Sequence, residues 1–135
     1  MGHEHVDLVN KLVDAAARQD LEGMLELTDP DVEWQPVFAQ LREGGAYRGH
    51  EGIEQWMADL AETTEALQSE IDDVLRVGAT ILAVGRLTYR GKGSGAEAET
   101  GVGYFIRVRD GRVLQLRAFR DPEDALALLG PSSEA

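Results

Sequence analysis

The sequence predicts an α+β fold in which helices gather on one face of a curved antiparallel sheet. Three observations lead to this prediction. Helix-spaced apolar residues occupy the first half of the chain, strand-like alternation occupies the second half, and an Asp-Gly pair marks a β-hairpin between residues 97 and 121. With 135 residues, the chain has the length of one domain. We expect a single domain, 1–135, with frayed tails at residues 1–5 and 131–135.

The first half of the chain is expected to hold three helices and one strand. Residues 6–18 show apolar side chains at the i, i+3, i+4, i+7 spacing of an amphipathic helix. Asp20 is a suitable N-cap for a shorter helix over residues 21–27. A short strand over residues 32–38 contains Pro36, which favours an edge position or a bulge. A third helix, residues 51–63, has the clearest apolar spacing in the sequence.

The second half of the chain is expected to form an antiparallel meander that ends in a short helix. Strands over residues 70–77 and 80–90 precede the hairpin, whose Asp110-Gly111 pair suits a type I′ turn. If the turn has two residues and no bulge intervenes, Tyr104 lies directly across from Arg117. The last helix has Asp121 as its N-cap, Pro122 at its first position and a Gly130 stop.

This register predicts that one face of the hairpin forms the wall of an apolar pocket. Tyr104, Gln115, Arg117 and Phe119 lie on this face among apolar residues. The opposite face carries small and apolar residues flanked by arginines, which suits a partner sheet.

Composition and motifs exclude several classes of function. The net charge of −12 argues against a nucleic-acid or anionic-membrane partner. The absence of cysteine excludes disulfides and thiolate metal sites, and no histidine or carboxylate spacing is typical of a metal site. The glycine-rich loop at residues 91–95 is followed by a strand and not by the helix of a phosphate-binding loop, so we expect no cofactor. No membrane span or leader is evident, and we expect a cytoplasmic protein.

Three stretches resemble SnoaL-like members of the NTF2-like superfamily, which contains ketosteroid isomerases and polyketide cyclases. They are ARQDLEGMLELTDPDVEW (residues 17–34), YRGHEGI (residues 47–53) and RVRDGRVLQLRAF followed by a short helix (residues 107–129). The resemblance implies a cone-shaped α+β barrel with a pocket between the helices and the sheet. It also implies a homodimer assembled through the sheet.

The resemblance assigns the known catalytic positions of the superfamily to residues of this chain. The isomerase base corresponds to Gln35, whose amide cannot accept a proton at neutral pH. One oxyanion-donor position corresponds to Leu12 and the other to Tyr104, which can donate a hydrogen bond. The acid/base aspartate of the polyketide cyclases corresponds to Asp121, although its residue pattern is equally that of a helix N-cap.

Neighbouring residues in a strand point to opposite faces, so only one of Glu33 and Trp34 can face the pocket. An inward Trp34 would contribute a large apolar surface to the core. An inward Glu33 would pair with Arg117, which is costly to bury alone. Both arrangements remain open. The candidate catalytic residues are Asp121, Tyr104 and Glu33, and the candidate pocket residues are Trp34, Tyr47, Trp56, Tyr104, Gln115, Arg117 and Phe119.

The sequence therefore predicts a small-molecule-binding protein whose pocket takes an apolar or aromatic compound. If the protein is an enzyme, the expected chemistry is isomerase- or cyclase-type proton transfer on a polyketide- or steroid-like compound. Tyr104 would then be the donor, with Asp121 or Glu33 as the base. The alternatives are a ligand-binding module without chemistry and a structural dimer whose cavity is filled by side chains.

Overall fold

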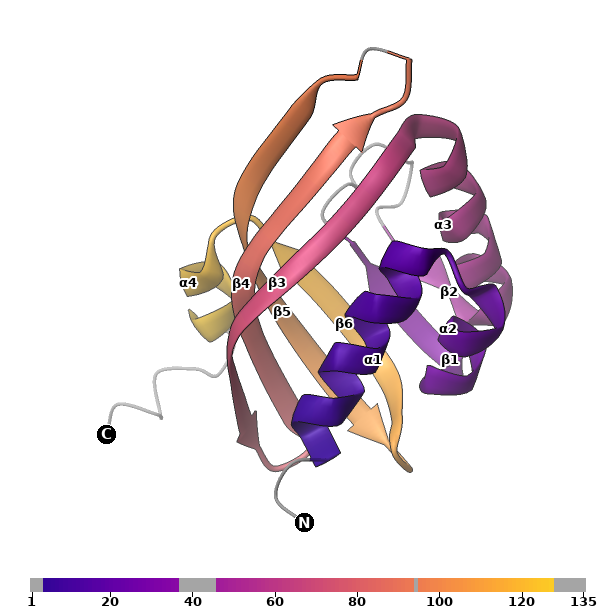
Figure 1. Cartoon of the computed structure of the whole chain (residues 1–135). Helices are drawn as coiled ribbons and strands as arrows, with labels where there is room; N and C mark the ends of the chain where they lie inside the picture. The colour runs from indigo at the N-terminus through magenta and orange to yellow at the C-terminus, as the bar shows by residue number, and fades with distance from the viewer. Residues whose placement is uncertain (1–3, 37–45, 94, 128–135) are drawn as a thin grey trace.

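The computed structural model describes residues 4–36, 46–93 and 95–127, and Figure 1 shows its elements. In chain order these elements are α1 (Glu4–Arg18), α2 (Leu21–Leu27), β1 (Thr28–Gln35), β2 (Tyr47–Arg48), α3 (Gly49–Thr63), β3 (Thr64–Val77), β4 (Thr80–Gly91), β5 (Glu97–Arg109), β6 (Arg112–Phe119) and α4 (Pro122–Ala127). None of the described helices is long and apolar enough to cross a membrane.

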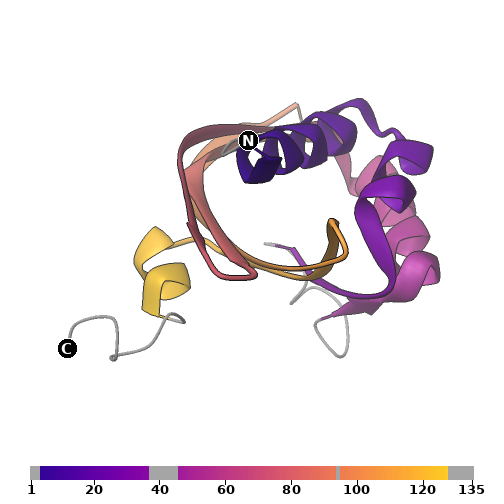
Figure 2. The ribbon, with the colours of Figure 1, turned by 90° about the horizontal axis from the view of Figure 1, so that it is seen from below.

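The described strands form one curved sheet in the order β2-β1-β6-β5-β4-β3. Strands β3 to β6 form the predicted antiparallel meander, and β1 joins it by pairing parallel to β6, so the sheet is mixed. Figure 2 shows that α1, α2 and α3 close the concave side, whereas α4 lies outside the barrel. The predicted fold class, a curved sheet with helices on its concave face and a short C-terminal helix, is confirmed.

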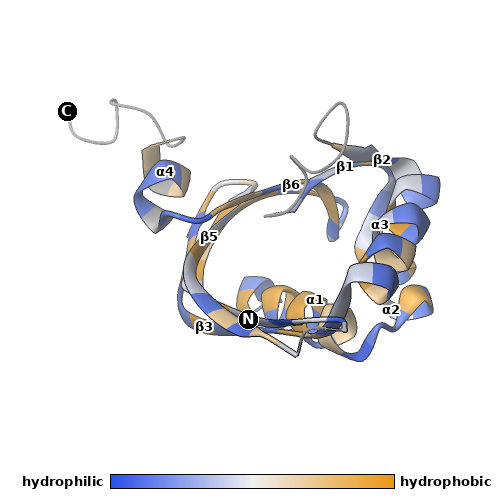
Figure 3. Cartoon of the chain, turned by 90° about the horizontal axis from the view of Figure 1, so that it is seen from above, coloured by the Kyte–Doolittle hydropathy of each residue, from blue (hydrophilic) through white to orange (hydrophobic). Residues whose placement is uncertain are grey.

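Apolar side chains fill the space between the helices and the concave face of the sheet. Figure 3 shows that the apolar residues of α1 face this interior. The largest fully buried side chains come from several elements and include Val9, Met24, Ile53, Ile81 and Ile106. Burying each aliphatic side chain of this size contributes about 1.5–3 kcal/mol, so this layer is a main source of stability.

Element boundaries in the first half differ from the prediction at β1. The Asp20 N-cap is confirmed, because its carboxylate accepts a hydrogen bond from the Gly23 N–H at 3.0 Å. Strand β1 begins at Thr28, four residues before the predicted strand, and the Thr28 hydroxyl donates to the Met24 carbonyl. Pro36 follows the last residue of β1, and β1 is an interior strand between β2 and β6. The predicted edge position is therefore wrong. A register shift of the kind that the alternative, a bulge, would cause does occur in β1, but earlier in the strand, between Thr28 and Glu33.

The turn of the β5–β6 hairpin is as predicted. Asp110 and Gly111 have positive φ angles of 54° and 79°, and Arg109 pairs with Arg112. Glycine adopts such angles at little cost, and aspartate is among the residues that tolerate them best.

The register beyond this turn differs from the prediction. A β-bulge shifts the ladder by one residue and leaves Leu114 of β6 without a partner in β5. Tyr104 consequently pairs with Ala118, and Arg117 pairs with Phe105. The predicted pairing of Tyr104 with Arg117 is wrong, because one extra residue moves every later side chain of β6 to the other face.

The bulge sends the polar residues of β6 to the convex face. Gln115, Arg117 and Phe119 lie on that face, and Leu116 and Ala118 face the interior. Placing Arg117 on the convex face is favourable because a buried arginine without a partner costs on the order of 3–5 kcal/mol. Apolar Leu116, which is 5% exposed, packs in the core instead.

Helix α4 packs on β5, β6 and β4 from outside the barrel. Its N-terminus is capped as predicted, because the Asp121 carboxylate accepts a hydrogen bond from the Glu123 N–H at 3.0 Å. The predicted Gly130 stop lies outside the described residues.

Candidate functional site: an apolar cavity inside the barrel

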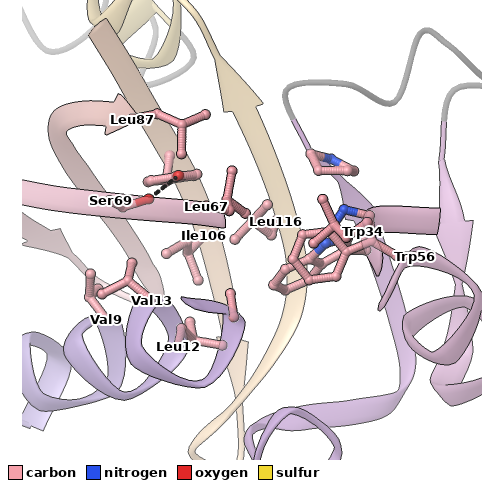
Figure 4. Close-up of a pocket in the computed structure, with 14 residues that line it drawn as sticks. Val9, Leu12, Val13, Trp34, Trp56, Leu67, Ser69, Leu87, Ile106 and Leu116 are labelled. Carbon is pink, nitrogen blue, oxygen red and sulfur yellow. Dashed lines mark hydrogen bonds between the residues drawn. The ribbon is translucent and has the colours of Figure 1, made fainter. Parts of the chain in front are cut away.

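An apolar cavity lies between α1, α3 and the concave face of the sheet (Figure 4). Its volume is about 60 Å³. The described residues that line it are Val9, Leu12, Val13, Ala16, Trp34, Pro36, Trp56, Leu60, Leu67, Ser69, Leu87, Tyr104, Ile106 and Leu116. All of them are apolar except Ser69 and Tyr104.

Helical and strand periodicity place these residues on one surface. Val9, Leu12, Val13 and Ala16 recur at helical spacing and form the side of α1 that meets the cavity. Leu67 and Ser69 alternate along β3 and face the same side of the sheet. The cavity thus lies between the inward apolar faces of α1 and the sheet.

Two tryptophans form one wall of the cavity. Trp34 comes from β1 and Trp56 from α3, and their ring centroids lie 5.1 Å apart with planes tilted by 54°. Both rings are buried, with 4% of Trp34 and 6% of Trp56 exposed. Among the described residues, the Trp34 indole N–H is the one buried side-chain polar group without a hydrogen-bond partner. Such an unmet donor costs about 1–3 kcal/mol, which makes this wall energetically unusual.

A pair of hydroxyl groups supplies the polar part of the lining. Ser69 on β3 and Tyr104 on β5 have their side-chain oxygens 2.9 Å apart. Burial raises the pKa of the Tyr104 hydroxyl above its usual value of 10.0, and the hydrogen bond with Ser69 opposes this effect more weakly. Tyr104 therefore stays protonated at neutral pH and is a hydrogen-bond donor or acceptor, not a base.

Tyr104 is the single titratable group in the described lining. A charged ligand would lose its hydration without gaining an opposite charge from these residues, which is strongly unfavourable. The arrangement is therefore suited to neutral molecules. No group of three or more His, Cys, Asp or Glu that could hold a metal ion occurs among the residues that the structure describes.

The structure decides between Glu33 and Trp34. Trp34 faces the cavity, and Glu33 lies on the convex face. Its carboxylate is 3.1 Å from the Arg48 guanidinium and accepts a hydrogen bond from the Gln115 amide at 2.9 Å. The alternative with an inward Glu33 paired to Arg117 is wrong.

The polar candidates on β6, Gln115 and Arg117, make their contacts on the convex face. Arg117 donates to the Gln35 side-chain oxygen at 2.9 Å and lies 5.3 Å from the centre of the Phe119 ring. Gln35, the position that corresponds to the isomerase base, is thus also outside the cavity. Gln115, Arg117 and Phe119 do not belong to the described lining.

The structure does not bring the three candidate catalytic residues together. Tyr104 lines the cavity, Glu33 is on the convex face, and exposed Asp121 caps α4 outside the barrel. Tyr47 is buried in the core, where its hydroxyl donates to the Asp59 carboxylate at 2.8 Å, and it is not among the lining residues. Of the pocket residues expected from the sequence, Trp34, Trp56 and Tyr104 line the cavity.

Ser69 and the apolar residues around it were missed at the level of sequence. The strand containing them was expected to begin at residue 70, whereas β3 begins at Thr64. The alternation of Leu67, Ser69 and Ile71 was the available signal, because residues spaced by two share one face of a strand.

Comparison with known proteins places the chain in a family. Residues 9–116 match the family model of the SnoaL-like domain. Because this match spans most of the chain, the protein belongs to the SnoaL-like family. A search among curated proteins found no significant match.

Several solved structures share the fold of this chain. An NTF2-like protein of unknown function from Burkholderia pseudomallei has a TM-score of 0.77 at 20% identity, over 93% of this chain and 96% of that chain. An NTF2-like protein from Burkholderia xenovorans has a TM-score of 0.72 at 28% identity, over 93% and 95%. A candidate SnoaL-like polyketide cyclase from Jannaschia sp. has a TM-score of 0.72 at 21% identity, over 92% and 90%.

Proposed function

We propose that this SnoaL-like protein binds a small, neutral and largely apolar molecule in the cavity inside the barrel. The observation that carries the proposal is the lining itself. Apolar side chains form nearly all of the described lining, and one hydroxyl pair interrupts them. Concave apolar cavities with a few polar groups are the usual form of small-molecule sites.

The volume of the cavity limits the size of the ligand. A cavity needs roughly 10–15 Å³ for each water, so this space would hold about four to six waters. At about 30 Å³ of liquid volume each, these waters occupy roughly 120–180 Å³, which is close to the liquid volume of a compound with a single six-membered ring and one small substituent. We therefore propose a single-ring compound and not the larger polyketide- or steroid-like compounds that the family resemblance implies.

The described lining favours binding without acid–base chemistry. Isomerase- or cyclase-type proton transfer needs a group that accepts a proton near neutral pH. Neither Glu33 nor Asp121 belongs to the lining, and the pKa of Tyr104 is shifted away from neutrality. Tyr104 can still orient a ligand by a hydrogen bond.

Tryptophan fluorescence provides a direct test, because the chain has two tryptophans and both line the cavity. We expect a single-ring hydrocarbon, methylenecyclohexane, to change this fluorescence saturably. Ala16→Leu should fill the cavity and weaken binding at least roughly tenfold, since overpacking of a formed cavity costs about 1–3 kcal/mol. Ala17→Leu, on the exposed side of α1, is the matched control. Absence of saturable binding to the wild-type protein would contradict the proposal.

We also propose that the protein is a homodimer assembled through the convex face of the sheet. Half-buried Phe105 and Phe119 lie on this face, and Leu75 and Val77 are about half exposed, at 48% and 52%. Exposed apolar side chains that gather on one face favour association. We expect a dimer mass in sedimentation experiments at micromolar concentration and a monomer for Phe105→Glu. A monomeric wild-type protein would refute the assembly but would leave the ligand site unaffected.

A further inference from the structure

The Ser69–Tyr104 pair contains one more hydroxyl proton than its internal hydrogen bond uses. The two oxygens are 2.9 Å apart, and either hydroxyl can be the donor. Each hydroxyl carries one proton and two lone pairs. Whichever group donates, the proton of the other hydroxyl remains available. Neither oxygen has a second hydrogen-bond partner among the described residues.

The pair keeps both protons under physiological conditions. Burial raises the pKa of Tyr104, and the serine hydroxyl does not ionise in this range. Both residues belong to the cavity lining, so the remaining proton is available to a molecule in this largely apolar space. A donor left without an acceptor in such a space costs about 1–3 kcal/mol.

The other end of the cavity adds to this excess of donors. Figure 4 shows Ser69 and the two tryptophans at opposite ends of the cavity. The indole N–H of Trp34 is a donor only, and it is buried without a partner. The described lining contains no carboxylate, side-chain amide or imidazole to accept these hydrogen bonds.

We propose that the Ser69–Tyr104 pair is the polar anchor of the site and that the ligand carries an acceptor oxygen, such as a ring carbonyl. This inference rests on the proposed function and narrows it to a class of compound. The ligand is a neutral single-ring molecule whose oxygen receives the proton left over by the pair. The anchor consists of two residues that act as one donor, so neither hydroxyl is individually required.

Two probes of similar shape distinguish the contribution of this hydrogen-bond donor from that of apolar packing. Cyclohexanone and methylenecyclohexane differ in having C=O or C=CH₂ at one ring position. Their affinities differ also because water solvates the ketone better. The ratio of the two dissociation constants is therefore compared between wild-type protein and variants, which cancels the solvation of the free probes.

The proposal predicts an unusual pattern across three variants. Ser69→Ala and Tyr104→Phe each leave one hydroxyl with its proton, so each should weaken cyclohexanone binding by no more than about threefold. The double variant removes the donor and should weaken it roughly tenfold, the upper range for one neutral hydrogen bond. Methylenecyclohexane accepts no hydrogen bond from the pair, so its binding should weaken in none of the three variants, which also demonstrates that the variants are folded.

The outcomes distinguish the anchor from the proposed function. Thr88→Val removes a hydroxyl of β4 that donates to Glu99 outside the cavity, and it should change the affinity for neither probe. If the double variant weakens both probes equally, or weakens neither, the anchor is refuted and the apolar site remains. If the wild-type protein binds neither probe, the proposed function itself is refuted.

Discussion

Tyr104 lies opposite Ala118 in the β5–β6 hairpin, and the bulge at Leu114 is what places it there. Without the bulge, Arg117 would lie opposite Tyr104 and would enter the apolar interior. With the bulge, Arg117 donates a hydrogen bond to Gln35 on the convex face, and Tyr104 shares a hydrogen bond with Ser69 inside the barrel. The bulge thus decides which polar groups meet the cavity.

Deleting Leu114 should be tolerated. The deletion would remove the extra residue of the bulge and restore an uninterrupted ladder, in which Gln115 still pairs with Arg107 and Arg117 with Phe105. Arg117 would thus stay on the convex face, and we expect a loss of about 0.5–3 kcal/mol, the usual range for a single change. Urea unfolding compares the deletion with Leu114→Ala, which keeps the residue count. A loss larger than that of Leu114→Ala by about 3–5 kcal/mol, the cost of burying an unpaired arginine, would show that the deletion turns Arg117 inward.

Gly85→Ala should disturb the pairing of β3 with β4. A Cβ atom at this position of β4 would collide with the carbonyl oxygen of Glu70 on β3. A backbone oxygen cannot rotate away as a side chain can, so we expect a loss of about 1–3 kcal/mol, as for other overpacked sites. The measurement is thermal unfolding, and a midpoint like that of the wild type would show that β3 can move freely.

Acid should destabilise the contact between Asp29 and Arg109. Two hydrogen bonds of 3.0 and 2.7 Å join the Arg109 guanidinium to the Asp29 carboxylate. These bonds, followed by one from the Asp31 backbone N–H, hold the pKa of Asp29 below its usual value of 3.8. A carboxyl group whose pKa is lower in the folded state stabilises that state above the unfolded pKa. This stabilisation is lost as the pH falls below about 3.8 toward the folded-state pKa.

Comparison with Asp29→Asn isolates this contribution. The wild-type protein should be more stable than the variant at neutral pH, and the difference should shrink as the pH falls below about 4. Urea midpoints at several pH values measure it. A difference that does not change with pH would mean that Asp29 acts through packing and not through its charge.

Trp34→Phe should cost less stability than Trp56→Phe. Both substitutions remove ring area from the same wall of the cavity. Only the first also removes the buried N–H that lacks a partner among the described residues, which offsets about 1–3 kcal/mol of the loss. Denaturant unfolding of the two variants tests this. A larger loss for Trp34→Phe would contradict an unmet donor at this position.

The predicted elements were correct where local patterns decide them. The helical spacing over residues 6–18, the Asp20 cap and the Asp110-Gly111 turn all depend on residues close in the chain, and each has the predicted form. The site was predicted less well. Trp34, Trp56 and Tyr104 line the cavity, but Ser69 was missed because its strand begins earlier than local propensity indicates.

The sequence by itself determined the fold class, the acidic character and the family of this protein, because periodicity, turn residues and charge are local properties of the chain. The tertiary structure alone decided which face of β6 meets the cavity and which of Glu33 and Trp34 turns inward. A bulge of one residue exchanges the two faces of a strand, and no clear local signal in the sequence marks it. It is favoured by tertiary contacts, because Arg117 then bonds to Gln35 on the convex face and Leu116 packs in the core.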